Sequence, residues 1–174
     1  TCLLPAYDER KRSSIILSSE PPYSNWKISY SFKGTDIIQS VLIKTKEDHL
    51  IMFFRPHSDP RFIWKSHSTD QGVSWTTPDM TSLPNPLSGI STISVNNSIA
   101  MIYNHTHEHK RYPLSVSVSR DKGTTWGEHW NLDNVKFEIS YPSFILGNKN
   151  TVHGLYTYNR RMIKYVKFNT EKFC

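Results

Sequence analysis

The stretch Ser68-Thr69-Asp70-Gln71-Gly72-Val73-Ser74-Trp75 decides the fold, because its spacing returns about 50 residues later as Ser119-Arg120-Asp121-Lys122-Gly123-Thr124-Thr125-Trp126. Both copies place Ser, Asp, Gly and Trp at relative positions 1, 3, 5 and 8. The Asp carboxylate can accept hydrogen bonds from its own turn, Gly supplies a positive φ, and Trp anchors the turn between sheet layers. We therefore predict two equivalent turns between third and fourth strands, with Trp75 and Trp126 largely buried.

A third, eroded copy runs from Ser19 to Trp26, where Pro21 and Tyr23 replace the Asp and the Gly. A repeat of about 50 residues with several short strands is typical of a β-propeller blade. No segment of useful length has a helical period, so the predicted class is all-β.

The alternating segments predict how these units are organised. In one unit we expect strands at 37–43, 49–55 and 62–66, with a turn at 46–48. The whole chain, 1–174, is predicted as one partial propeller with a blade remnant at 1–33. Four-stranded antiparallel blades are expected at 36–80, 88–132 and 140–174, the last ending before its fourth strand. A six-bladed ring needs roughly 300 residues, so the chain is a fragment, pairs with another copy, or closes unusually.

The repeated turn resembles the Asp-box of the sialidase superfamily. Further segments similar to bacterial and plant sialidase-like propellers are Phe53 to Arg55, Leu83 to Gly89, Tyr103 to Leu114, and Ser140 to Pro142. The resemblance covers nearly the whole chain, as the C-terminal half of a sialidase-like domain. In that family the Asp-box lies far from the catalytic centre, so the motif indicates fold rather than chemistry.

The resemblance also implies candidate site residues. Active sialidases clamp the sialate carboxylate with three arginines and use a Tyr nucleophile, an activating Glu and an acid/base Asp. By position, Arg55 resembles the second arginine, Arg111 the third, and Tyr141 the nucleophile. A guanidinium binds a carboxylate through two parallel hydrogen bonds, and a neutral Tyr suits attack beside an anionic substrate. Alternatively, the arginines are surface residues and Tyr141 is a packed strand-start aromatic.

Two departures from the family pattern count against activity. Gln39 stands where the activating Glu is expected, and Gln cannot serve as a base. Glu138 is the alternative candidate for the base, although a loop carboxylate is the simpler interpretation. By the same resemblance, the first arginine and the acid/base Asp would precede Thr1. The chain alone is therefore expected to hold an incomplete site, with Gln39 among its substrate-binding residues.

The composition bounds the other possibilities. The chain has 174 residues, 37% of them hydrophobic, and a net charge of +6. The basic segments 9–12 and 160–164 allow an anionic partner, but they are equally typical of a solvated surface. No nucleic-acid motif accompanies them, so nucleic-acid binding ranks last. No apolar run reaches the length of a membrane span.

Several smaller features leave alternatives open. His105, His107 and His109 would share one face on a strand, but without a carboxylate or Cys cluster a polar loop is favoured and no metal or cofactor is expected. Cys2 and Cys174 could pair or be unrelated thiols. The sequons at Asn96 and Asn104 lean weakly toward secretion.

The leading functional hypothesis is a sialidase-like exo-glycosidase fragment that acts on or recognises acidic sugars such as sialic acid. The alternative is a non-catalytic glycan-binding or scaffold propeller. Expected partners are a sialylated or other acidic glycan and either the missing N-terminal half or a second copy.

Overall fold

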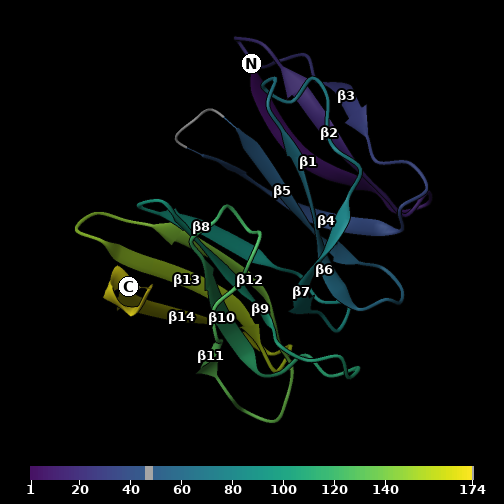
Figure 1. Cartoon of the computed structure of the whole chain (residues 1–174). Coiled ribbons are helices and arrows are strands. Elements are labelled where there is room, and N and C mark those ends of the chain that lie inside the picture. Colours follow the sequence, from purple (N-terminus) through teal and green to yellow (C-terminus); the bar gives the residue numbers. More distant parts are fainter. Residues whose placement is uncertain (46–48, 174) are drawn as a thin grey trace.

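The computed structural model describes residues 1–45 and 49–173, and it confirms the all-β prediction (Figure 1). The strands are β1 (Cys2–Asp8), β2 (Ser13–Ser19), β3 (Lys27–Ser31), β4 (Ile37–Lys44), β5 (Leu50–Pro56), β6 (Phe62–Ser68), β7 (Asp79–Pro84), β8 (Ser91–Val95), β9 (Ser98–Asn104), β10 (Leu114–Ser119), β11 (Trp130–Asp133), β12 (Ile139–Leu146), β13 (Thr151–Tyr158) and β14 (Met162–Asn169). A 3-10 helix, η1 (Thr170–Phe173), follows β14. The predicted turn at 46–48 and Cys174 lie outside the described residues. Within the described ranges, no helix is long and apolar enough to cross a membrane.

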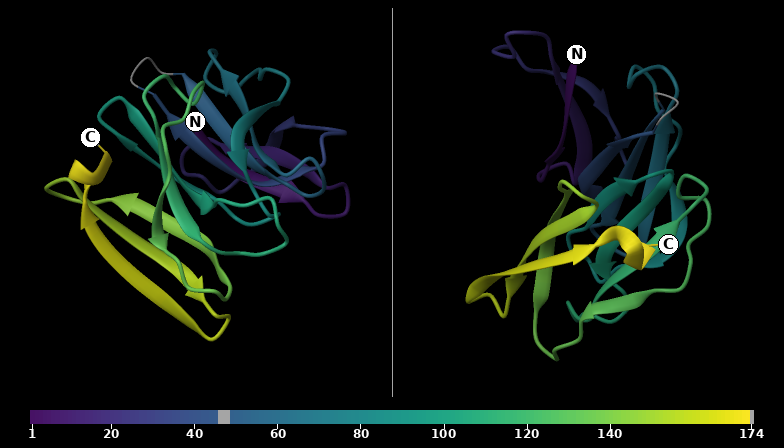
Figure 2. Two further views of the ribbon diagram at one scale, coloured as in Figure 1. Left: turned by 60° about the horizontal axis from the view of Figure 1, so that its bottom comes forward. Right: turned by 90° about the vertical axis from the view of Figure 1, so that its left-hand side faces the viewer.

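The strands form three sheets that follow one another along the chain (Figures 1 and 2). The first has seven strands in the order β1-β2-β4-β5-β6-β7, with β3 also paired to β2. It is larger than the predicted four-stranded unit because one parallel pair, Ser13 with Ile37, joins β1–β3 to β4–β7. The second sheet is four-stranded and antiparallel, and the third consists of β12, β13 and β14.

The central strands β5 and β9 are buried along nearly their whole length because both of their faces are covered. Phe53 of β5 packs with Met101 of β9 in one cluster, while the next residue, Phe54, packs against the β1–β3 side. The same alternation holds on β9, where Ile102 faces the β12–β14 sheet. Since successive strand residues point to opposite faces, each central strand contributes to two layers of core.

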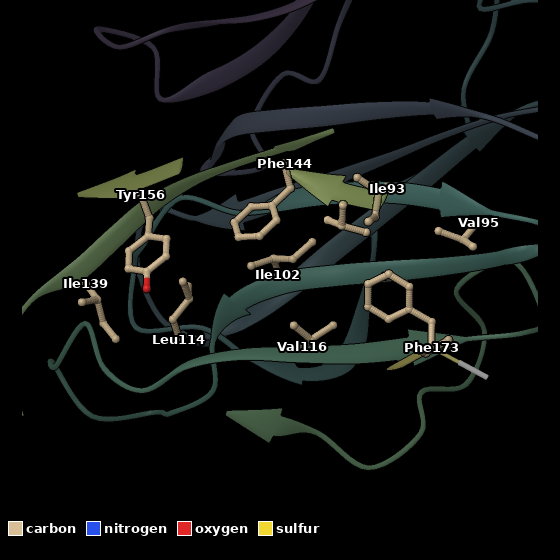
Figure 3. Close-up of a cluster of buried hydrophobic side chains, with 12 residues drawn as sticks. Ile93, Val95, Ile102, Leu114, Val116, Ile139, Phe144, Tyr156 and Phe173 are labelled. Carbon is tan, nitrogen blue, oxygen red and sulfur yellow. The ribbon is translucent and has the colours of Figure 1, made fainter. Parts of the chain in front are cut away.

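The core between the second and third sheets is shown in Figure 3. Ile102 and Val116 from one sheet meet Phe144 and Tyr156 from the other, and all four are buried. Gly154 is required opposite this cluster, because a Cβ there would lie 2.1 Å from the Phe144 ring. The third sheet is thus fixed to the second by large side chains and a close backbone approach.

The two repeated turns have matching hydrogen bonds. In the first, the Ser68 hydroxyl donates to Asp70 at 2.8 Å and accepts from the Gly72 N–H at 2.8 Å. The Asp70 carboxylate accepts the Ser74 N–H at 2.9 Å, and hydrogen bonds from Ser74 lower its pKa to about 2. Gly72 has a φ of 89°, which favours glycine. The turn is therefore held by its own side chains.

The second turn repeats these contacts at equivalent positions. Ser119 donates to Asp121 at 2.8 Å and accepts from Gly123 at 2.7 Å. The Thr125 N–H donates to Asp121 at 2.8 Å, and hydrogen bonds from Thr125 lower the pKa of Asp121 to about 2. The shared spacing in sequence thus corresponds to a shared hydrogen-bond pattern.

The two tryptophans differ in burial, so the prediction for Trp126 is corrected. Trp75 is buried, packs on Phe32, and donates its indole N–H to Gly72 at 3.1 Å. Trp126 contacts Phe53 but is only partly buried, and its indole nitrogen has no partner among the described residues. Trp75 is more buried than Trp126 because side chains from the β1–β3 segment pack against it.

Candidate functional site

Arg55, Arg111 and Tyr141 come from separate segments and meet at one place. Arg55 lies near the end of β5, Arg111 lies between β9 and β10, and Tyr141 lies in β12. The Nη1 atom of Arg111 donates to the Tyr141 hydroxyl at 3.0 Å, and its guanidinium carbon lies 5.2 Å from the centre of that ring. The cluster is built from side chains that are distant in sequence.

One main-chain oxygen anchors both arginines. The Leu87 carbonyl accepts a hydrogen bond from Nη1 of Arg55 at 2.8 Å and from Nη2 of Arg111 at 3.4 Å. Leu87 lies between β7 and β8 with a φ of 61°, a backbone conformation that is uncommon for a bulky residue. The loop therefore holds two cations side by side.

The Arg55 guanidinium has an unfavourable environment for its charge. Burial lowers its pKa, the Tyr141 hydroxyl opposes that shift, and the charge of Arg111 lowers the pKa further. The Nε atom of Arg55 is buried without a partner in the described part of the chain. An anion bound between the two arginines would relieve their repulsion and use the remaining donors.

Glu138 is an ion-pair partner in this cluster. Its carboxylate accepts hydrogen bonds from the Ser140 hydroxyl and from Arg160, each at 2.7 Å, and from Arg111 at 3.3 Å. Burial raises the pKa of Glu138, but the hydrogen bonds from Ser140 and Arg160 and the charges of Arg111 and Arg160 together lower it. The Arg111 guanidinium thus contacts both Glu138 and the Tyr141 hydroxyl.

Gln39 lies on the other side of Tyr141. Its side-chain amide donates to the Tyr7 hydroxyl at 3.4 Å, and Gln39, Tyr7 and Tyr141 line one cavity. Tyr7 also raises the pKa of Arg55, although burial is the larger effect. Tyr7 could not be found from sequence, because its strand carries no motif that marks a functional residue.

Asn104 ties together the backbone around the site. Its Oδ1 atom accepts from the Ser88 hydroxyl at 2.7 Å, and its Nδ2 atom donates to the carbonyls of Pro113 at 3.0 Å and Ile139 at 2.9 Å. Asn104 and Ser88 are both fully buried. The three partners lie next to the segments that carry Leu87, Arg111 and Tyr141, so one amide fixes the relative position of all three.

This role separates the two predicted sequons. Asn104 is buried and its amide is fully used, which is incompatible with a glycan on the folded chain. Asn96 is exposed at the β8–β9 turn and remains a possible acceptor. The sequence pattern alone could not distinguish them.

The three alternating histidines do not lie on a strand. His105 to His109 follow β9 in a loop, where His105 stacks on His129 with ring centres 3.6 Å apart and contacts the Tyr103 hydroxyl. Burial and the charges of His129 and His107 lower the pKa of His105 to about 4. Among the described residues, no group of three or more His, Cys, Asp and Glu could hold a metal ion.

Comparison with family models matches residues 1–153 to the BNR repeat-like domain. The chain belongs to the BNR repeat-like domain family. Comparison with curated proteins finds no match.

Solved structures share the fold of this BNR repeat-like chain at low sequence identity. The NanB sialidase from Streptococcus pneumoniae has a TM-score of 0.81 and 14% identity over 99% of this chain and 29% of its own. The intramolecular trans-sialidase from Ruminococcus gnavus has a TM-score of 0.79 and 16% identity over 98% of this chain and 41% of its own. The alpha-L-arabinanase from Penicillium chrysogenum has a TM-score of 0.65 and 14% identity over 95% and 57%. The chain thus spans less than half of either sialidase.

The solved structures with this fold include two sialidases and an arabinanase, so the likeness shows the fold and does not specify an activity. The ligand of this chain must therefore be inferred from its own side chains. Two arginines, a phenol and a neutral amide offer planar donors for a carboxylate and hydrogen bonds for a polar ring.

Proposed function

We propose that this chain recognises the carboxylate of an acidic sugar such as sialic acid, as part of a sialidase-like domain. The observation that carries the proposal is the arginine pair, Arg55 and Arg111, held by the single carbonyl of Leu87 beside the Tyr141 hydroxyl. Two guanidinium groups this close repel each other unless an anion neutralises them. A carboxylate matches both their charge and their planar donor geometry.

The proposed frame is a partial propeller of the sialidase type, with a blade remnant at 1–33 and blades at 36–80, 88–132 and 140–174. It is supported by three sheets packed in sequence order and by matching turns after β6 and β10. In such a propeller, the first strands of consecutive blades run beside the central channel and end at one shared opening. The NanB sialidase and the trans-sialidase, which share the fold of this chain, support this architecture by analogy.

The proposed chemistry is weak or absent hydrolysis with retained binding. Tyr141 would be the nucleophile of a sialidase-like exo-glycosidase, but its neighbour Gln39 cannot accept a proton. Glu138, the other candidate, is already paired with Arg111 and Arg160. These contacts favour the alternative of a glycan-binding propeller without efficient turnover.

Further sheets are proposed to pack against the third sheet. Its outer face exposes Ile145, Leu155, Ile163 and Tyr165, of which Ile145 is 65% and Ile163 is 64% exposed. The inner faces of the sheets are covered by the next sheet along the chain. An additional blade, from a longer chain or a second copy, would cover this surface in the same way.

The test combines two assays on the purified chain. Saturation-transfer NMR with N-acetylneuraminic acid should show binding, while a fluorogenic sialoside should show little turnover. Turnover near the enzyme median of about 10 per second would refute the proposed loss of hydrolysis. Absence of sialic acid binding would refute the carboxylate proposal itself.

A further inference from the structure

A cavity of about 430 Å³ lies beside the arginine pair and is lined in part by β1, β4 and β12. Its walls include Tyr7, Gln39, Ser40, Gly89 and Tyr141. Among the described residues that line it, none carries a charge. Small-molecule pockets usually measure about 300–1,000 Å³, so the cavity has room for an uncharged part of a ligand.

Gln39 and Ser40 face this cavity because β4 is interrupted there. The register between β4 and β5 shifts between Ile38 and Val41, and Gln39 has a φ of 46°. Tyr141 lies in a similar register shift on β12 with a φ of 53°. Left-handed backbone at non-glycine residues is costly and concentrates at functional sites. Both interruptions turn polar side chains toward the same space.

Two residues that line the cavity each have a buried polar atom without a partner in the described part of the chain. These atoms are Oε1 of Gln39 and Oγ of Ser40. The amide nitrogen of Gln39 points to Tyr7, which leaves the amide oxygen free. A buried acceptor without a donor is unfavourable. A donor on a ligand would satisfy it.

Gly89 keeps the space between these groups open. A Cβ at this position would lie 3.2 Å from Cδ1 of Tyr141 and 3.8 Å from Oε1 of Gln39. Gly89 is also only two residues beyond Leu87, whose carbonyl anchors the arginines. The cavity and the arginine pair therefore share one loop, and they also share Tyr141, which lines the cavity and accepts a hydrogen bond from Arg111.

We propose that Tyr7, Gln39, Ser40 and Gly89 form a subsite for a neutral hydrogen-bond donor, a hydroxyl or an amide N–H, on the sugar whose carboxylate binds the arginine pair. This inference rests on the proposed function and extends it to a second recognition point. The uncharged lining disfavours a charged substituent, because no opposite charge would offset its desolvation.

The test compares ligands that differ in the proposed donor. N-acetylneuraminate carries a carboxylate, hydroxyls and an amide, while cyclohexanecarboxylate carries only the carboxylate on a ring. Dissociation constants from NMR titration are measured for the unmodified chain, Gln39→Leu and Ser40→Ala, with thermal unfolding as a check of folding. A sialic acid analogue with a hydroxyl in place of the acetamido group separates the two kinds of donor.

We expect Gln39→Leu to weaken N-acetylneuraminate binding roughly five- to tenfold and to leave cyclohexanecarboxylate binding unchanged. Ser40→Ala, which removes only a hydroxyl, should show the same selectivity if Gln39→Leu fails to fold. Equal effects on both ligands, or no effect on either, would overturn the subsite. If the unmodified chain binds neither ligand, the proposed function fails and the subsite fails with it. If the variants weaken binding of the acetamido compound but not of its hydroxyl analogue, the amide N–H is the donor that the subsite binds.

Discussion

The Ser88 hydroxyl donates a 2.7 Å hydrogen bond to Oδ1 of Asn104, and both residues are fully buried. The same Asn104 amide donates to the carbonyls of Pro113 and Ile139. A buried side chain with all its polar atoms satisfied specifies one arrangement of the segments it joins. Here those segments carry the candidate binding residues.

Ser88→Ala should therefore weaken carboxylate binding as well as stability. Removing the donor leaves Oδ1 of Asn104 unsatisfied, which costs about 1–3 kcal/mol, and it frees the loop that presents the Leu87 carbonyl. Ser115→Ala is the matched control, since Ser115 is also fully buried and donates to Oδ1 of Asn131 at 2.9 Å. Chemical denaturation should show a smaller loss for Ser115→Ala, because Asn131 is exposed and can bond water, and only Ser88→Ala should reduce sialic acid affinity. Equal affinity losses would mean that Ser88 acts through general stability.

The two turn carboxylates should make the fold sensitive to acid. Hydrogen bonds within the turns lower the pKa values of Asp70 and Asp121 to about 2 from the ordinary value of 3.8. A lowered pKa in the folded chain gives stability that is present above about pH 4 and is lost as the pH falls toward about 2.

The double variant Asp70→Asn with Asp121→Asn should lose less stability between pH 5 and pH 2, as measured by urea unfolding. Asp79→Asn, at a carboxylate 3.9 Å from Lys65 and outside the turns, serves as the control. An unchanged loss of stability with acid in the double variant would show that the turn hydrogen bonds do not stabilise the folded state.

The outer face of the third sheet should promote association. Leu155 and Ile163 are exposed there, and a contiguous apolar surface favours burial against another sheet. Sedimentation velocity should show self-association of the chain that decreases in Leu155→Glu with Ile163→Lys. Val73→Glu, which changes an exposed apolar residue on the turn after β6, should have no such effect. A monodisperse monomer at high concentration would contradict this prediction.

The strands were predictable from sequence because period-two alternation directly reflects which face of a strand is buried. The turn hydrogen bonds were also predictable, because Ser68, Asp70 and Gly72 lie within a few residues of one another and bond within one turn. Tyr7 and Gln39 could not be paired in this way, since 32 positions separate them. Asn104 matches a sequon through its Asn-His-Thr spacing, whereas its partners, the Ser88 hydroxyl and two backbone carbonyls, carry no local sequence signal.

The partial burial of Trp126 could not be predicted from its motif either. Its turn has the same Ser, Asp, Gly and Trp spacing as the turn around Trp75, but different side chains pack around the two rings. Local spacing predicts the turn, while burial depends on what the rest of the fold places over it.

The most direct test of the central claim is the affinity of N-acetylneuraminate for Arg111→Lys, measured by isothermal titration calorimetry. Lysine keeps the charge but loses the paired donors, so we predict at least tenfold weaker binding, equivalent to about 1.4 kcal/mol. Arg120→Lys is the control, because Arg120 contacts the Phe173 carbonyl instead. Unchanged affinity in Arg111→Lys, or equal losses in both variants, would contradict a carboxylate site at the arginine pair.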